Sequence, residues 1–341
     1  MRPTAARQVG EGAPPFTETI PEVSAAAWRH NHVLDLDDFT REEIELIFAI
    51  TDGMKEILGR EIKRAPTLRG KTVVTIFFEP STRTRASFEL AARALSADVL
   101  NITASASSVV KGESLVDTLR TLQALGADVL VMRHSQSGAP YLAAKQVNMS
   151  VVNAGDGTHA HPSQALLDMY TMRSHLGRLE GRKVVIIGDI LHSRVARSNI
   201  WGLAAMGAEV VVCGPPTLLP LYMAEDKAAG QIPRVTVETD AGRAVENADV
   251  VMALRLQLER QQKDLLPAVR EYVRYYQITP GLLARARPGA LVMHPGPVNE
   301  GIEVSPEVSH GANSVIEEQV SNGVAVRMAL LYLLAGGKKQ R

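Results

Sequence analysis

A dense cluster of hydrogen-bond donors lies in the segment 77–89, whose sequence is FFEPSTRTRASFE. Five consecutive positions hold two arginines and three hydroxyl side chains, and both kinds of group suit a phosphate. An apolar run at 73–78 precedes the cluster, and apolar residues at helical spacing follow it from Ala86 to Leu95. At such a junction of strand and helix, unpaired N–H groups and the helix dipole attract anions. We interpret the segment as a phosphate site made by Ser81, Thr82, Arg83 and Thr84.

Ordinary helix capping is the alternative interpretation of this cluster. Ser81 or Thr82 would then cap the helix while the arginines face solvent. Several donors that converge on one turn exceed what a cap needs, and this favours the anion site.

More polar residues follow the other apolar runs of the sequence. Each has an ordinary alternative role, in a surface ion pair, a helix cap or a turn. Ligands of open α/β sheets bind beyond the carboxyl ends of the strands, so we expect these residues to surround one cleft that binds several negative charges. They are Arg133, His161, Gln164, Arg194, Arg255, Gln257 and the turn His294-Pro-Gly-Pro.

Three other segments resemble known motifs but lack their essential residues. The GKT at 70–72 has Ala65 where a P-loop needs glycine, and the segment GDILHSRVAR lacks the later glycines of a dinucleotide site. His159 and His161 lie near Asp156 without third and fourth ligands at metal spacing, so zinc stays a weaker alternative. We expect no cofactor and no metal.

Helical and strand patterns alternate from about residue 32 onward. This alternation predicts two parallel sheets, one in each half, each covered on both faces. Strands are expected near 73–78, 97–102, 128–132, 150–153, 183–187, 209–213, 235–237, 249–253 and 290–293. The main helices are expected at Thr40 to Leu58, Ala86 to Leu95, Ser114 to Leu125, Tyr141 to Gln146, Ser163 to Leu176 and Ser314 to Ala335. The fifth of these would join the two halves.

Length and composition narrow the class of protein. A chain of 341 residues fits two domains, and 37 basic against 37 acidic residues indicate no general attraction to nucleic acid or a membrane surface. The single cysteine, Cys213, lies in an apolar run and is expected to be buried. No apolar stretch reaches membrane-spanning length, so we expect a cytoplasmic protein.

Residues 1–27 resemble a flexible extension, with a targeting segment as the weaker alternative.

Seven motifs in fixed order identify a family resemblance from about Trp28 to the C-terminus. They are FFEPSTRTRASFE, VVKGESLVDT, VMRHSQSGA, HPSQALLD, GDILHSRVARS, LRLQLER and MHPGPVNEGIE. The chain resembles the aspartate and ornithine carbamoyltransferases, and most of all the catalytic chains of the aspartate enzymes. The resemblance implies an α/β fold of two doubly wound parallel-sheet domains with the active site in the cleft between them. The first domain would comprise 28–162 plus the C-terminal helix 312–341, and the second 163–311.

The resemblance also implies residue roles. Carbamoyl phosphate would bind to Ser81, Thr82, Arg83, Thr84, Ser107, Lys111, Arg133, His161 and Gln164. Aspartate would bind to Lys111, Arg194, Arg255, Gln257, Gly296 and Pro297. The catalytic groups would be Arg83, Thr84, Lys111, Arg133 and His161.

The implied reaction transfers the carbamoyl group to the amine of L-aspartate, as in pyrimidine biosynthesis. Ornithine is the alternative acceptor, but an ornithine site commonly has a cysteine in the turn that here is His294-Pro-Gly-Pro. A non-catalytic anion-binding or regulatory subunit is a second alternative, although Lys111, Arg133 and His161 are all present.

The implied assembly is a homotrimer in which Ser107 and Lys111 act in a neighbour's site. Regulatory chains or a dihydroorotase-like partner are also implied as possible associates. One position departs from the family pattern: Glu300 stands where related chains often have arginine after the HPGPVN asparagine.

Overall fold

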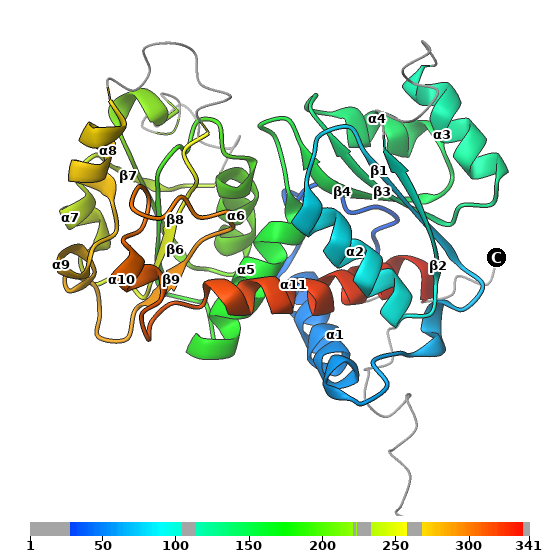
Figure 1. The fold of residues 1–341 in the computed structure, drawn as a ribbon, viewed down its shortest axis with the longest axis horizontal. Helices are drawn as coiled ribbons and strands as arrows, with labels where there is room; N and C mark the ends of the chain where they lie inside the picture. The colour runs from blue at the N-terminus through cyan, green and yellow to red at the C-terminus, as the bar shows by residue number, and fades with distance from the viewer. Residues whose placement is uncertain (1–27, 104–113, 221–222, 224–232, 258–267, 337–341) are drawn as a thin grey trace, which may run out of the picture.

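The computed structural model describes residues 28–103, 114–220, 223, 233–257 and 268–336, which form two parallel β-sheets. The first sheet has the strand order β2-β1-β3-β4, and the second has the order β7-β6-β5-β8-β9 (Figure 1). Each sheet thus reverses its strand order next to its first strand, as in doubly wound folds. The strands are β1 (Thr72–Phe77), β2 (Asp98–Thr103), β3 (Val129–His134), β4 (Ser150–Asp156), β5 (Lys183–Ile187), β6 (Glu209–Cys213), β7 (Thr236–Glu238), β8 (Val250–Ala253) and β9 (Leu291–Met293).

Helices cover both faces of each sheet. The α-helices are α1 (Arg41–Gly59), α2 (Thr82–Ala94), α3 (Leu115–Ala124), α4 (Ala139–Gln146), α5 (Pro162–Leu176), α6 (Arg194–Ala205), α7 (Ala241–Val245), α8 (Val269–Tyr276), α9 (Pro280–Leu283), α10 (Pro306–Ser309) and α11 (Ile316–Leu331). Short 3-10 turns lie at Pro66–Leu68 and Pro216–Leu218, and a π-helical turn, Tyr332–Gly336, continues α11.

Alternating side chains of the strands enter different cores, because successive strand residues point to opposite faces. In β5, Val185 and Ile187 pack with α7 residues in a core confined to the outer side of the second sheet. Val184 and Ile186 of the same strand belong to a larger core that also contains Val73 of the first sheet. One hydrophobic core therefore connects the two halves of the molecule.

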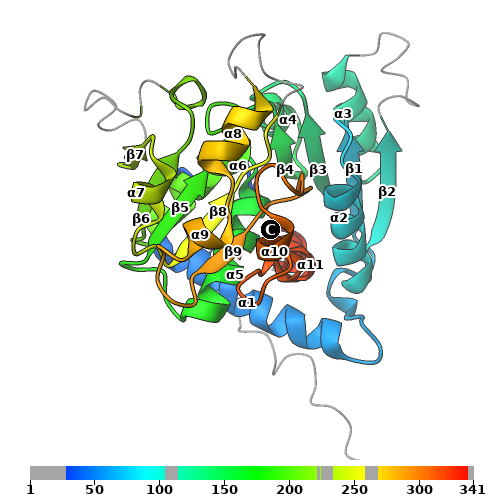
Figure 2. The same ribbon diagram turned by 60° about the vertical axis from the view of Figure 1, so that its left-hand side comes forward.

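The helices α5 and α11 run between the two sheets (Figures 1 and 2). Residues of α11 pack against α1, α2 and α5, and the helix also contacts β9 of the second sheet. This packing supports placing the C-terminal helix with the first half. The expected domain boundaries stay a prediction, and the expected extension 1–27 lies outside the described residues.

The predicted fold class, α/β with two parallel sheets, is confirmed. Helix α2 begins at Thr82, four residues before the predicted start at Ala86. The prediction began too late because the first turn of the helix is polar and shows no apolar periodicity.

Cys213 is buried in β6, where burial, followed by nearby carboxylates, raises the pKa of its thiol to about 12. Within the described ranges, no helix combines the length and apolar character needed to cross a membrane.

Candidate active site

A cavity of about 800 Å³ is lined by residues from both halves of the chain. The predicted site residues that line it are Ser81, Thr82, Arg83, Thr84, Arg133, His161, Gln164, Arg194, Arg255, Gln257, Gly296 and Pro297. Residues distant in sequence are therefore brought to one place. Ser107 and Lys111 lie outside the described residues.

The predicted phosphate segment forms the first turn of α2. Ser81 is the N-cap residue, with extended backbone, but its side chain makes no capping hydrogen bond. Thr82, Arg83 and Thr84 are the first three helical residues, and the first turn carries no acidic side chain. The alternative in which the Ser81 side chain caps the helix is therefore wrong, and the helix N-terminus lines the cavity with hydroxyl and guanidinium side chains.

Arg83 reaches from the first half to the turn after β9. A Cβ on Gly296, whose φ is +67°, would lie only 3.1 Å from Cζ of Arg83, so glycine permits this close approach. Burial, and then the charge of Arg255, lowers the pKa of Arg83. Cationic side chains from the two halves are thus close enough to repel unless an anion lies near them.

Glu79 joins two of the predicted arginines, a role that the sequence analysis did not assign. Arg133 at the end of β3 donates through Nη2 to Oε1 of Glu79 at 2.5 Å. Arg194, the first residue of α6, donates to the two carboxylate oxygens at 2.5 and 3.1 Å. Gly155 has φ of +113°, and a Cβ there would lie 2.9 Å from Nε of Arg194, so only glycine leaves room for this guanidinium.

His161 is a buried, uncharged donor or acceptor at the N-terminus of α5. Burial, then the charges of Arg133, Arg194 and Arg327, holds the pKa of its imidazole well below the ordinary 6.5. Its backbone N–H donates to Ser198 Oγ of α6 at 2.9 Å. The ring therefore faces cationic neighbours without carrying a charge at neutral pH.

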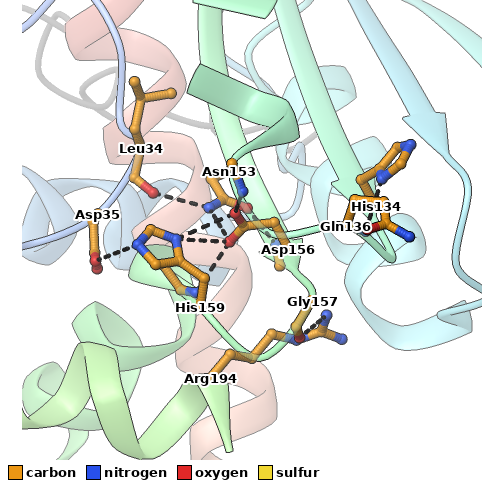
Figure 3. Close-up of polar contacts among 12 residues, drawn as sticks. Leu34, Asp35, His134, Gln136, Asn153, Asp156, Gly157, His159 and Arg194 are labelled. Carbon is orange, nitrogen blue, oxygen red and sulfur yellow. Dashed lines mark hydrogen bonds and ion pairs between the residues drawn. The ribbon is translucent and has the colours of Figure 1, made fainter. Parts of the chain in front are cut away.

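A polar cluster supports the loop between β4 and His161 (Figure 3). Asp156 is fully buried, accepts from Asn153 Nδ2 at 2.8 Å and lies 3.2 Å from Nδ1 of His159. The other ring nitrogen of His159 lies 3.8 Å from Asp35. His159 and Asp156 thus form a structural ion pair, and the described residues contain no group of three or more His, Cys, Asp or Glu side chains arranged to hold a metal.

Glu303 positions the cavity-lining loops of the second half. Its buried carboxylate accepts from the backbone N–H of Leu256 at 3.0 Å and from that of Asn299 at 2.7 Å. Leu256 lies between the predicted residues Arg255 and Gln257, and Gln257 donates to the carbonyl of His192 at 3.1 Å. The loop after β8 and the turn after β9 are therefore held in fixed relation.

The cavity lining also includes residues of α11, which sequence reasoning missed. Arg327 is buried, lies 5.1 Å from the ring centre of Phe88, and has a pKa lowered to about 10 by its burial. The only sequence signal was an arginine inside an apolar helix pattern. Glu300, the departure from the family pattern, lies 2.8 Å from Nε2 of His310 and does not line the cavity.

Two family models together match most of the chain. The aspartate/ornithine carbamoyltransferase carbamoyl-P binding domain matches residues 31–174, and the corresponding Asp/Orn binding domain matches residues 180–334. The aspartate carbamoyltransferase catalytic subunit of Dehalococcoides mccartyi (strain CBDB1) is 58% identical over 96% of this chain and 98% of its own length. That of Chloroflexus aggregans is 63% identical over 90% and 99%.

Solved structures of carbamoyltransferases have the same overall fold as this chain. An ornithine carbamoyltransferase from Pyrococcus furiosus has a TM-score of 0.81 and 32% identity, covering 93% of this chain and 100% of its own. Aspartate transcarbamoylase from Trypanosoma cruzi in complex with carbamoyl phosphate has a TM-score of 0.81 and 30% identity, covering 93% and 99%. With the ordered motifs, the two-sheet fold and the shared cavity, these matches show that the chain belongs to the aspartate/ornithine carbamoyltransferase family.

Proposed function

We propose that the chain transfers the carbamoyl group of carbamoyl phosphate to the amine of L-aspartate, giving N-carbamoyl-L-aspartate and phosphate. This is an early step of pyrimidine biosynthesis. The observation that carries the proposal is the single cavity that gathers Arg83, Arg133, Arg194 and Arg255 from both halves. Relatives more than half identical over nearly the whole chain are aspartate carbamoyltransferase catalytic subunits.

Carbamoyl phosphate is proposed to bind at the N-terminus of α2. Ser81, Thr82, Arg83 and Thr84 would supply hydroxyl, guanidinium and backbone donors to the phosphate. A phosphate in a partly closed cleft needs such cations because it is poorly solvated there. Lys111 and Ser107 would contribute from a neighbouring subunit, as the family resemblance implies.

The reacting carbonyl is proposed to lie between Thr84, Arg133 and His161. The neutral amine of aspartate attacks the carbamoyl carbon, the new C–N bond forms, and the C–O bond to phosphate breaks with its electron pair leaving on phosphate. The leaving phosphate takes the amine proton. During the attack the carbonyl oxygen becomes an oxyanion, and each well-placed hydrogen-bond donor to it lowers the activation free energy by about 3 kcal/mol. Because its pKa is depressed, His161 can serve as a neutral donor rather than a general acid.

The aspartate carboxylates are proposed to bind Arg194, Arg255 and Gln257, beside Gly296 and Pro297. Two guanidinium groups match two carboxylates, with Glu79 orienting Arg194. The ornithine alternative is less well supported because Cys213, the only cysteine of the chain, is buried in β6, and the turn 294–297 has none.

The assembly is proposed to be a homotrimer with active sites shared between neighbours. The curated relatives are named as catalytic subunits, which supports an oligomer. Association with regulatory chains or with a dihydroorotase is a further expectation from the family.

The proposed function is tested by incubating the purified protein with carbamoyl phosphate and either L-aspartate or L-ornithine, with colorimetric detection of the ureido product. We expect product with aspartate only. N-(Phosphonacetyl)-L-aspartic acid, which a T. cruzi aspartate transcarbamoylase structure holds, should inhibit the reaction. Product with ornithine alone would overturn the choice of acceptor, and no product with either would favour the non-catalytic alternative.

A further inference from the structure

Three amide side chains from three helices converge on the buried carboxylate of Asp168. Gln164 of α5 and Gln319 of α11 donate through Nε2 to its Oδ1 at 2.9 and 2.8 Å. Asn199 of α6 donates through Nδ2 to its Oδ2 at 2.9 Å. Asp168 has no exposed surface, and Gln164 and Gln319 both line the cavity. The cluster thus borders the cavity through two of its amides. We call the place proposed above for the reacting carbonyl, between Thr84, Arg133 and His161, the acyl subsite.

Backbone groups fix which way two of these amides face. The backbone N–H of His294 can only donate, and it donates to Oε1 of Gln319 at 3.0 Å. The Nε2 of Gln319 must therefore face Asp168. In the same way, the carbonyl of Val195 can only accept, and it accepts from Nδ2 of Asn199 at 3.0 Å. Both carboxylate oxygens of Asp168 are consequently acceptors.

The ionisation of Asp168 is consistent with both of its carboxylate oxygens accepting hydrogen bonds. Burial raises the pKa of its carboxyl to about 6, against the opposing effect of the three amide donors and of the charge of Arg327. At neutral pH the group is a carboxylate, which accepts hydrogen bonds and cannot donate one.

The orientation of Gln164 follows from that of its neighbours. Since Asp168 can only accept, Gln164 must present its NH₂ group to it, and its Oε1 is then left for the cavity. Among the described residues, no donor bonds to this oxygen. A ligand in the acyl subsite therefore meets a fixed hydrogen-bond acceptor.

We propose that Asp168 is a positioning residue that sets donor selectivity: it holds the Gln164 oxygen toward the cavity, so the site selects an acyl phosphate whose acyl carbon bears N–H. The inference rests on the proposed function and deepens it. An acyl group with methyl in place of NH₂ has the same shape but leaves the acceptor desolvated and unpaired.

Gln319 extends the network into the second half. By accepting from His294 and donating to Asp168, it connects the turn at the proposed aspartate subsite with the amide at the proposed acyl subsite. The recognition of the two substrates thus depends on one buried chain of hydrogen bonds.

The test compares kcat/KM for carbamoyl phosphate with that for acetyl phosphate, at saturating aspartate and neutral pH. We expect the ratio to fall on the order of tenfold in Asp168→Ala, because the Gln164 amide loses its fixed orientation. If acetyl phosphate turns over too slowly, its inhibition constant against carbamoyl phosphate replaces its kcat/KM in every variant.

Asn322→Ala is the matched control. Like Asp168, Asn322 is buried and takes part in a hydrogen bond between α5 and α11. It lies in α11 and donates to Thr171 of α5 at 3.0 Å, but it does not line the cavity. We expect this variant to keep the wild-type ratio. A ratio that falls equally in Asn322→Ala would show a general effect of the α5–α11 interface and would overturn the proposal.

A second variant keeps the proposal testable if Asp168→Ala does not fold. Gln164→Met preserves size without the acceptor, and its ratio should fall by a similar factor. Where both fold, adding Asp168→Ala to Gln164→Met should change the ratio no further, since both act through one amide. An unchanged ratio in Gln164→Met, or in folded Asp168→Ala, overturns the inference. Failure of wild-type protein to carbamoylate aspartate would instead refute the proposed function.

Discussion

At the scale of single residues, the candidate site is defined by an excess of positive charge that one carboxylate organises. Glu79 binds both Arg133 and Arg194, and Arg83 lies near Arg255. Paired arginines are held in fixed directions, so they present an ordered surface to an anionic ligand. The two arginines of the first half, Arg83 and Arg133, are proposed to bind carbamoyl phosphate, and the two of the second half, Arg194 and Arg255, are proposed to bind aspartate.

Arg255→Ala is expected to raise the KM for aspartate on the order of tenfold or more, because a charge-assisted contact to one carboxylate is lost. Binding of carbamoyl phosphate should be spared. Steady-state kinetics with each substrate varied in turn measures both effects. Arg243→Ala is the control, since Arg243 pairs with Glu238 on the surface and lies outside the cavity. Equal loss of affinity for both substrates would refute the division between the two subsites.

His159→Gln is expected to destabilise the protein in a pH-dependent way. Hydrogen bonding to Asp156, then the charges of Asp156 and Asp35, raises the pKa of His159 above 6.5 against the effects of burial and Arg197. A raised folded-state pKa gives stability that is full below 6.5 and lost as pH rises through the folded value. The difference in unfolding free energy between wild type and variant, up to roughly 1 kcal/mol, should shrink from pH 6.5 to pH 9.

Denaturant unfolding at several pH values measures this difference. The charged groups facing His159 are Asp156, Asp35 and Arg197. Asp35, whose pKa burial raises to about 6, stays largely ionised across that range. A difference that grows with pH would contradict the assigned ion pair.

At the scale of elements, most parts of the site lie where a strand or helix ends, whereas Arg327 lies within α11. The N-terminus of α2 brings the residues proposed to bind phosphate, that of α5 brings His161, and the turns after β8 and β9 bring the residues of the second half. Glu303 and Asp168 act between elements, since Glu303 accepts a hydrogen bond from Leu256 and Asp168 accepts from Asn199 and Gln319, all distant in sequence. Rigid elements position the site more firmly than loops alone could.

Gly296→Ala is expected to reduce kcat/KM for carbamoyl phosphate on the order of tenfold or more, because the added methyl would displace Arg83. Gly301→Ala is the matched control: its φ of +80° imposes comparable backbone strain, but nothing lies within 4 Å of the added Cβ. Both variants should lose similar thermal stability, and only the first should lose activity. Equal kinetic effects would show that strain, rather than Arg83, is responsible.

At the scale of the whole molecule, the cavity depends on a core that spans both sheets. Residues of α1, α5 and α11 belong to that core together with strand residues of each sheet. Any relative movement of the two halves must therefore be accommodated around packed helices. Ligand-driven closure of such a cleft is expected to contribute to the rate by bringing two substrates together.

Shared active sites can be tested by mixing two inactive chains. Lys111→Ala removes the group proposed to act in a neighbour's site, and Arg83→Ala removes one within the chain's own site. Denaturing and renaturing the two together should restore partial activity, because some sites then contain both native residues. Each variant alone, treated identically, is the control. No recovery in trimers verified by mass to contain both chains would count against sharing.

Much of the fold could be predicted from local pattern. The β-branched runs and helical periods locate the strands near their observed positions, because period 2 and period 3.6 are local properties. Boundaries with polar residues were less predictable, as at Thr82, where the first turn of α2 shows no apolar period. Ser107 and Lys111, expected from the family, stay predictions because they lie outside the described residues.

The sequence by itself determined the kinds of elements, the donor-rich segment proposed to bind phosphate and the set of donors that follow the strands. Tertiary structure alone decided that Glu79 joins Arg133 to Arg194, that Arg327 reaches the cavity, and that the Gln164 amide faces one way. The physical reason is that each of these features depends on contacts between residues far apart in the chain, which for Gln164 are those of Gln319 and Asn199 with Asp168. Their distances depend on how α5 and α11 pack between two sheets. Local periodicity indicates which side chains are buried, but not which residues they contact.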